Sequence, residues 1–285
     1  MKVWIGMFVS LSCLVVAISI LVGRGRDEDQ EVMAEDLKRS DAPPITDLEI
    51  IVAYDNYPHT DGLKTGWGFS CVVRGPGKTI LFDTGGDGAV LLSNMEKLQI
   101  DPKEIDAVVL SHIHMDHVGG LGCFLAENAD VIVYVPRSFP DGLKQAVRTA
   151  GAKTVDVHGP VEICGSVYST GELGTGLKEQ SLIVRTDKGL IVITGCAHPG
   201  IVKIVRRAAD LLREDVLFVM GGFHLGGASQ REMESILSSF RKAKVHRVGP
   251  CHCTGDGPIG MFAEQFGPDF VRVGVGRTIR MADLQ

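Results

Sequence analysis

The sequence predicts a layered α/β sandwich. Three observations predict it: short β-branched runs come in pairs early in the chain, later apolar runs alternate with segments of helical periodicity, and the composition is globular, with 45% hydrophobic and 22% charged residues. The same composition excludes a largely disordered chain. The seven cysteines show no even-spaced framework, which argues against a disulfide scaffold, and the net charge of −6 gives no general basic surface, so no nucleic-acid partner is expected.

The N-terminal segment has the pattern of a membrane anchor or a signal segment. Residues 3–22 are apolar or small and carry no charge, and a helix needs about 20 such residues to cross the bilayer core. The exit, Gly23-Arg24-Gly25-Arg26, is a poor cleavage site, so we predict an uncleaved transmembrane helix within residues 1–26, with a signal segment as the alternative. The polar composition of residues 27–46 predicts a solvated linker before a globular domain over residues 47–285. We therefore expect the protein to be membrane-anchored or exported, with its side of the membrane left open by positive charge at both ends of the helix.

Each element of the globular domain follows from a local pattern. Short apolar runs predict strands at residues 48–53, 69–73, 79–82, 107–110, 131–135, 155–157, 161–163, 167–169, 216–220 and 247–249. Helical spacing of apolar residues predicts helices at residues 89–98, 142–150, 201–212 and 230–243. Residues 181–185 and 190–194 flank Asp187-Lys188-Gly189, where glycine suits a tight turn, so they are expected to form a hairpin. The tail, residues 270–280, is strand-like.

A tight group of metal-ligand residues follows the strand predicted at residues 107–110. His112, His114, Asp116 and His117 fall within six positions of Ser-His-Ile-His-Met-Asp-His. Imidazole nitrogen and carboxylate oxygen are ligands that zinc, manganese and iron accept. In a loop that leaves a strand, the first two histidines can face one metal, while Asp116 and His117 face a second. Two metals about 3.5–4 Å apart activate a bridging hydroxide and hold both oxygens of a displacement.

Three further histidines each follow a predicted strand. His198 lies in Gly-Cys-Ala-His-Pro-Gly, His224 in Gly-Gly-Phe-His-Leu and His252 in Pro-Cys-His-Cys-Thr-Gly. Open α/β sheets bind ligands at the carboxyl ends of their strands, so these side chains are expected to reach the same edge as the first cluster. Each histidine alone is more often a structural or surface residue than a ligand. Together with the cluster, they indicate one shared site.

These motifs resemble those of a known superfamily. Residues 111–120 resemble the HxHxDH signature of the metallo-β-lactamase superfamily, and Leu81-Phe82-Asp83-Thr84-Gly85 resembles its upstream Asp-Thr-Gly turn. Tyr54-Asp55-Asn56, residues 179–182 and the three distal histidine motifs resemble the branch of 7,8-dihydropterin-6-methyl-4-(β-D-ribofuranosyl)-aminobenzene-5′-phosphate synthases. The resemblance implies an αββα sandwich of two facing sheets with helices outside, so that residues 47–285 would form a metallo-β-lactamase-like catalytic domain.

The resemblance also implies a set of metal ligands. His112, His114, Asp116 and His117 match the family cluster, and His252 stands where the superfamily's last metal histidine falls. At the position of the usual bridging aspartate this chain has Cys196, and where a further histidine is usual only Glu179 stands. We therefore rank His198 above Glu179 and Cys196 as the missing ligand.

The resemblance further suggests roles around the metals. His224 resembles a substrate-facing histidine that can protonate a leaving oxygen. Asp116 is the other candidate catalytic residue. Asp83, Asp55 and Asn56 are expected to orient ligands or to border the pocket, as groups behind metal ligands do.

Two enzymatic functions fit these expectations. The leading hypothesis is a hydrolase with two divalent ions, zinc first and manganese or iron as alternatives, whose metal-bound hydroxide attacks an ester, lactone or phosphodiester. The alternative is a transferase like the family's namesake, which would join a phosphorylated aromatic ribofuranosyl compound to a pterin alcohol diphosphate. Either takes a small-molecule substrate.

A non-enzymatic sensor at a membrane is a third hypothesis, which the complete ligand set disfavours. Trp67 stands where this branch often has a charged residue or histidine, which indicates a substrate other than the namesake's.

Overall fold

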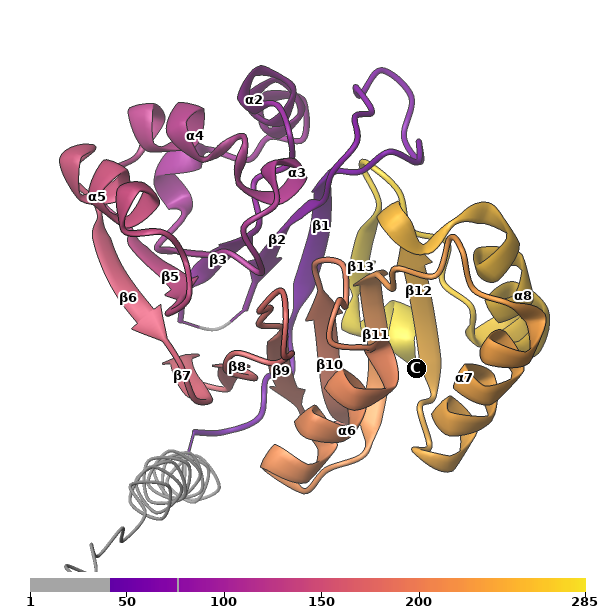
Figure 1. Ribbon diagram of the computed structural model, residues 1–285. Coiled ribbons are helices and arrows are strands. Elements are labelled where there is room, and N and C mark those ends of the chain that lie inside the picture. The colour runs from indigo at the N-terminus through magenta and orange to yellow at the C-terminus, as the bar shows by residue number, and fades with distance from the viewer. Residues whose placement is uncertain (1–41, 76) are drawn as a thin grey trace, which may run out of the picture.

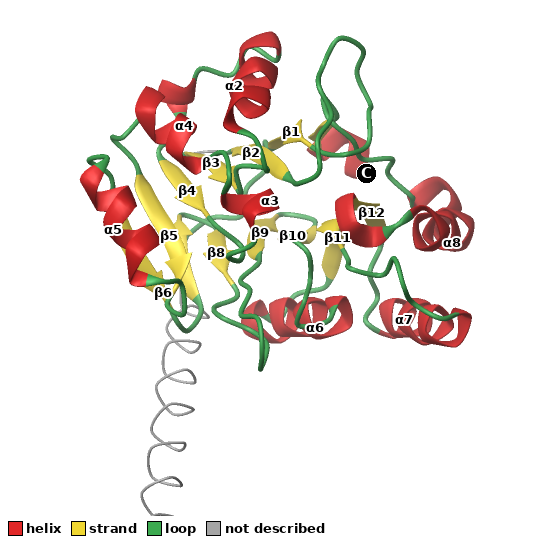
Figure 2. Cartoon of the chain, turned by 45° about the horizontal axis from the view of Figure 1, so that its top comes forward, coloured by secondary structure: helices red, strands yellow, loops and turns green. Residues whose placement is uncertain are grey.

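The computed structural model describes residues 42–75 and 77–285, which form two mixed β-sheets packed face to face with helices on both outer sides (Figures 1 and 2). The predicted sandwich is therefore confirmed for this part of the chain. The predicted N-terminal helix, whether anchor or signal segment, and most of the predicted linker lie outside the described residues. Within residues 42–75 and 77–285, each helix is too short or too polar to span a bilayer.

The first sheet has the strand order β13-β1-β2-β3-β4-β5-β6. Its strands are β1 (Glu49–Tyr54), β2 (Ser70–Arg74), β3 (Thr79–Phe82), β4 (Ala107–Val109), β5 (Ile132–Pro136), β6 (Lys153–Val157) and β13 (Thr278–Arg280). The second sheet has the order β12-β11-β10-β9-β8-β7. Its strands are β7 (Val161–Cys164), β8 (Val167–Ser169), β9 (Leu182–Thr186), β10 (Gly189–Thr194), β11 (Val216–Gly222) and β12 (Arg247–Cys251). The predicted hairpin is confirmed, because β9 and β10 pair antiparallel around the turn.

The helices cover the outer faces of the two sheets. The α-helices are α2 (Gly88–Lys97), α3 (Met115–Val118), α4 (Leu121–Glu127), α5 (Asp141–Thr149), α6 (Ile201–Leu212), α7 (Gln230–Lys242) and α8 (Asp256–Phe266). Short 3₁₀ turns occupy η1 (Pro102–Glu104), η2 (His252–Thr254), η3 (Gly267–Asp269) and η4 (Met281–Leu284). Figure 2 shows α2, α4 and α5 outside the first sheet and α6 and α7 outside the second.

Alternation along the strands builds three apolar layers. In β1, Ile50 joins the core between the sheets, whereas Ile51 packs with α2 and α4 on the outside. In β10, Ile191 joins the same inner core, whereas Val192 packs against α6 and α7. Period-two side-chain direction explains this division, because successive residues of a strand point to opposite faces. Both sheets are thus fixed in register, which sets where their strand ends lie.

Two stretches differ from the sequence prediction. Only the last three residues of the strand predicted at 270–280 join the sheet, as β13. The alternating valines of this tail are buried as expected, but a Cβ at Gly274 would lie 2.7 Å from the carbonyl oxygen of Tyr57, so the tail packs against a loop there. Helices α3, α4 and α8 were not predicted, since glycine or proline within or beside them conceals their periodicity.

Packing begins a little before the predicted domain start. Ile45 is buried, donates its N–H to the carbonyl of Arg185 at 3.0 Å and accepts from the N–H of Asp187 at 3.3 Å. The last residues that composition placed in the linker therefore lie along the β9–β10 hairpin.

Candidate metal centre

The predicted ligands meet at one edge of the sandwich. The HxHxDH residues follow β4 of the first sheet, whereas the distal histidines follow β10, β11 and β12, which run parallel to one another in the second. Ring contacts join the two sheets: the His112 and His198 ring centroids lie 4.8 Å apart, and those of His117 and His252 lie 5.1 Å apart. The convergence expected from the strand ends is therefore present.

The first group of ligand atoms consists of three imidazoles. His112, His114 and His198 each offer a nitrogen, and these nitrogens lie within 4.8 Å of one another. The Nε2 atom of His112 is 3.2 Å from the Nδ1 atom of His114. Among the described residues, His198 Nε2 is buried and has no hydrogen-bond partner. A buried nitrogen of this kind is costly unless something else binds it, and a divalent cation at the centre of the group would satisfy all three lone pairs.

The second group is mixed. Asp116, His117, Cys196 and His252 also offer atoms that lie within 4.8 Å of one another. The sulfur of Cys196 is 3.2 Å from His117 Nε2, and Asp116 Oδ2 is 3.3 Å from His252 Nε2. Cys196 also groups with His198 and His224, so its sulfur lies between the two groups. The donor set of imidazole, carboxylate and thiol fits zinc well.

Asp83 orients one ligand from each group. Its Oδ2 atom lies 2.7 Å from His117 Nδ1 and accepts a hydrogen bond of 2.7 Å from the Ser111 hydroxyl. The Ser111 oxygen in turn lies 2.9 Å from His112 Nδ1. Because a carboxylate only accepts, His117 carries its proton on Nδ1, and Ser111 is left to accept from His112. Both imidazoles then present a free Nε2 lone pair to the metal positions, as partners behind metal ligands commonly arrange.

Asn56 orients the imidazole of His252 in the same way. Its Oδ1 atom lies 2.8 Å from His252 Nδ1, and its amide nitrogen donates to the backbone carbonyl of the same residue at 3.3 Å. The expectation that Asn56 lies behind a candidate ligand thus agrees with the geometry. Its neighbour Asp55 is fully buried, accepts a hydrogen bond of 2.7 Å from the Tyr57 N–H, and interacts with the thiol of Cys251.

The burial of Asp55 predicts a pH dependence of stability. Burial raises the pKa of Asp55 to about 7, against the lowering effect of hydrogen bonds from Cys251 and from backbone N–H groups. A carboxyl whose pKa is higher in the folded protein binds more protons there, so the free energy of unfolding falls as pH rises from about 4 to about 7. Asp55→Asn removes this titration, and we expect it to be more stable than the parent by up to about 4 kcal/mol at about pH 8 and similar at about pH 4. Urea unfolding across this range measures both proteins, and equal pH slopes would contradict the assignment.

The resemblance left Glu179 open as a metal ligand, but its carboxylate binds backbone N–H groups. One carboxylate oxygen accepts from the N–H groups of Cys196 and Ala197 at 3.0 and 2.8 Å, and the other from the N–H of His198 at 2.9 Å. The side chain is buried, so these three bonds replace water. Glu179 therefore holds the loop that carries Cys196 and His198, and it belongs to neither group of converging ligand atoms.

Burial lowers the pKa of three candidate ligands, His112, His198 and His252. It lowers the pKa of His112 far below its usual range, reinforced by the neighbouring histidines. It lowers the pKa of His198 to about 4, again with help from nearby histidines, and it lowers that of His252 in spite of Asp116. A neutral imidazole is the form that binds a metal, so these shifts suit ligands at neutral pH.

For the remaining residues of the site, neighbouring groups change the pKa as strongly as burial does. Burial alone lowers the pKa of His117, but the charge and hydrogen bond of Asp83 raise it more. Burial alone raises the pKa of Asp116, but its interactions with His252 and His117 bring it well below the usual range. The hydrogen bond with the Cys253 thiol, together with burial, raises the pKa of the Cys196 thiol. A metal ion beside Cys196 would counter that effect, because cations stabilise thiolates.

The site also concentrates backbone strain. Left-handed conformations outside glycine occur at four residues of this edge, namely Asp83, Ala197, His224 and His252, with φ between 49° and 60°. Each such residue costs on the order of 1–3 kcal/mol and persists only where the surroundings over-determine it. For Ala197, the bond from its N–H to Glu179 provides that restraint. His224 is solvent-exposed, with its ring 4.4 Å from that of His198.

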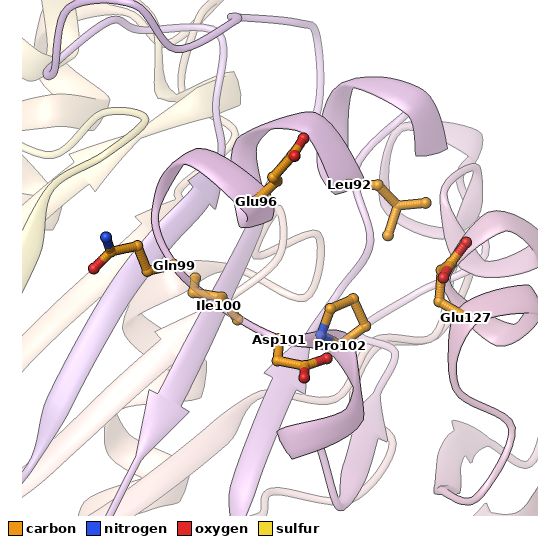
Figure 3. Close-up of a pocket in the computed structure, with 7 residues that line it drawn as sticks. All are labelled: Leu92, Glu96, Gln99, Ile100, Asp101, Pro102 and Glu127. Carbon is orange, nitrogen blue, oxygen red and sulfur yellow. The ribbon is translucent and has the colours of Figure 1, made fainter.

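A cavity elsewhere in the domain is unrelated to this chemistry. A pocket of about 480 Å³ lies beside α2, η1 and α4. Figure 3 shows residues that line it, among them Glu96, Asp101 and Glu127. None of the converging histidines contributes to it. Two further pockets, of about 680 and 380 Å³, are lined by His224 and open beside the metal centre.

Comparisons with known proteins identify the family. Residues 67–215 match the sequence profile of the Metallo-beta-lactamase superfamily. The chain belongs to this superfamily. It is 30% identical over 248 residues, covering 71% of this chain and 84% of the relative, to the 7,8-dihydropterin-6-methyl-4-(beta-D-ribofuranosyl)-aminobenzene-5'-phosphate synthase of Methanocaldococcus jannaschii. The predicted membership of the metallo-β-lactamase superfamily is confirmed.

Solved structures support the same conclusion. The structure of Tm1679, a metal-dependent hydrolase of the beta-lactamase superfamily, is 30% identical with a TM-score of 0.68 and covers 81% of this chain and 98% of its own. The metallo-beta-lactamase fold protein YhfI from Bacillus subtilis has a TM-score of 0.62 at 12% identity and covers 82% and 99%, a likeness of fold alone. Together with the two ligand groups, these relatives identify the chain as a metal-dependent enzyme of the metallo-β-lactamase fold.

Sequence reasoning missed two features of this metallo-β-lactamase site. Ser111 stands directly before His112, and its position at the end of the predicted strand was the available signal. Lys203, Arg206 and Arg207 line the larger pocket beside His198 and His224. Their spacing of three and four residues on a predicted helix would have placed them on one face.

Proposed function

We propose that this protein is a dinuclear metal-dependent hydrolase that cleaves an ester, lactone or phosphodiester bond of a small molecule. The observation that carries the proposal is the pair of adjacent ligand groups, three imidazoles in one and a carboxylate, a thiol and two imidazoles in the other. Two divalent ions held there would polarise the scissile bond and lower the pKa of a water molecule to about 7. Zinc is the ion that we propose, because a thiol and imidazoles together favour it over manganese.

The residues of the chain divide the remaining work. Asp83, Ser111 and Asn56 keep the Nε2 atoms of the candidate ligands turned inward. Asp116 contributes a carboxylate beside His117 and His252, where it fixes the geometry around the reacting centre. His224 is exposed at the mouth of the site, and we assign it the role of proton donor to the leaving oxygen.

Charge in the larger pocket supports an anionic substrate. Lys203, Arg206 and Arg207 on α6 line this pocket of about 680 Å³ and outnumber its two carboxylates, Asp210 and Glu232. Among the described residues, Arg207 Nε is buried and has no hydrogen-bond partner. An arginine with unused donors is suited to bind phosphate or carboxylate. We therefore propose that the substrate carries such a group a short distance from the bond that is cleaved.

A transferase is the second candidate, and the M. jannaschii synthase is the observation that favours it. In that case the same cations would hold a diphosphate leaving group, and an aromatic nucleophile would take the place of water. The membership of the superfamily is common to both functions, so the distinction depends on whether water suffices as the second reactant.

The test starts from the full-length protein purified without added metal. Elemental analysis is expected to find about two divalent ions per chain, as a two-metal site requires. A panel of a nitrophenyl ester, a bis-nitrophenyl phosphodiester and an acyl lactone, each with and without an anionic substituent, is then assayed before and after chelation. Metal-dependent turnover with water alone supports the hydrolase. Metal content with no hydrolysis, but with coupling of an aromatic amine to an alcohol diphosphate, would establish the transferase instead, and metal with neither activity would leave the sensor.

A further inference from the structure

Trp67 presents apolar surface at the mouth of the metal centre. Among the described residues, Trp67 and Met115 are the large hydrophobic side chains that are exposed, by 61% and 69%. The indole ring centroid lies 5.0 Å from that of His252, at an interplanar angle of 55°. Exposed tryptophan is uncommon on a surface with no binding role, because its large apolar ring remains in water.

The backbone that carries Trp67 is fixed with respect to the candidate ligands. Gly68 has a φ of 142°, and a Cβ there would collide with the carbonyl oxygen of Asp116. That same carbonyl accepts a hydrogen bond of 3.3 Å from the Phe69 N–H. On the other side, a Cβ at Gly66 would collide with the hydroxyl of Tyr54. Trp67 is thus held between two close contacts, one of which is with the backbone of a candidate metal ligand, so its position is built into the site.

A pocket adjoins the indole. It has a volume of about 380 Å³ and is bounded by Trp67, His224, the segment from Leu225 to Ala228, and Glu232. A Cβ at Gly227 would meet no atom within 4 Å, so there is open space beside this part of the segment. His224 and Glu232 line both this pocket and the larger one, so the two cavities adjoin beside the metal centre.

We propose that this smaller pocket binds an uncharged planar aromatic ring of the substrate, stacked on Trp67. The proposal rests on the metallohydrolase function and extends it to substrate class: one arm is aromatic, the other anionic, and the scissile bond lies between them. An aromatic pair gains about 0.5–1.5 kcal/mol beyond the area that it buries, which an aliphatic group of the same size does not. Glu232 lines both pockets, but the described residues that line the smaller one include no Lys or Arg, so there its carboxylate disfavours a negative charge on the ring. It can accept a hydrogen bond from an amino or hydroxyl substituent.

Paired substrates test the stacking. Two esters or lactones with the same scissile bond and anionic arm are compared, one with a phenyl and the other with a cyclohexyl group. Trp67→Leu, which keeps apolar bulk without a ring, is expected to lower kcat/KM about tenfold for the phenyl substrate and less than about twofold for the cyclohexyl one. Trp67→Phe is expected to restore most of the loss. Metal content should be equal in all three proteins, because Trp67 offers no ligand atom.

Fluorescence gives a readout that does not depend on turnover. The chain has two tryptophans, Trp4 and Trp67, so Trp4→Phe leaves one indole as reporter. Titration of this variant with 4-nitrobenzyl alcohol is expected to give saturable quenching, whereas Trp67→Phe, which keeps Trp4, should show only the linear quenching of collisions. Equal losses on both paired substrates together with linear quenching of Trp67 would overturn the aromatic subsite while leaving the hydrolase intact. Saturable quenching without turnover of any panel substrate would keep the subsite and reject the hydrolase.

Discussion

Replacing His114 by alanine is expected to remove metal and activity together. His114 is solvent-exposed and offers Nδ1 at 3.2 Å from His112 Nε2, so its loss leaves the first group with two imidazoles. Because the side chain is exposed, the variant should fold normally. Its metal content should fall by about one ion per chain, and kcat/KM should fall by more than the roughly 10–100-fold that follows loss of a group behind a ligand. Elemental analysis and the hydrolysis assay measure both quantities on the same sample.

The control for His114→Ala is His246→Ala, because His246 is also exposed and belongs to neither ligand group. It should retain both metal and activity. Full metal content in His114→Ala would show that the HxHxDH cluster does not bind the ion as proposed, whatever happened to turnover.

Replacing Glu179 by glutamine is expected to damage both metal positions at once. The carboxylate accepts three backbone N–H groups, and the two oxygens divide them between Cys196 and Ala197 on one side and His198 on the other. Glutamine has one oxygen and an NH₂ group, which would face a backbone donor. The unmade bond costs about 1–3 kcal/mol, and the loop that bears Cys196 and His198 must shift to relieve it. We expect lower stability in urea together with a metal affinity reduced by about 10–100-fold.

Glu172→Gln is the matched control for this variant. Glu172 is another largely buried carboxylate that accepts a backbone N–H, from Ser138 at 2.7 Å, but it lies outside both ligand groups. Its glutamine keeps an oxygen for the Ser138 N–H and can turn its NH₂ toward His158 Nδ1, so it should lose less stability and keep its metal. If Glu179→Gln lost stability while binding metal as tightly as the parent, the loop would not be what positions the ligands.

The sequence predicted the parts of the site that depend on strand ends. β10, β11 and β12 run parallel, so residues that follow each of them reach one edge whatever the details of the loops. For that reason His198 and His252 could be expected beside the HxHxDH cluster.

The role of Glu179 could not be predicted in this way. Its carboxylate oxygens accept from the backbone N–H groups of residues 196–198. Loop conformation decides whether a carboxylate binds the backbone or a metal, and the sequence does not reveal that conformation. The left-handed φ of Ala197 is equally invisible in the sequence, because alanine rarely adopts this conformation. The strand predicted at residues 270–280 was too long for a related reason. The alternating valines of this tail are buried as in a strand, but Gly274 packs against the backbone of a loop.

Through its hydroxyl, Ser111 links the two halves of the candidate centre. The hydroxyl donates to Asp83, which fixes His117, and lies 2.9 Å from His112, which belongs to the other half. The shared serine and aspartate would be ordered by an ion at either imidazole, so part of the ordering cost of a second ion would already be met. We therefore expect an ion in one half of the candidate centre to favour binding of an ion in the other half.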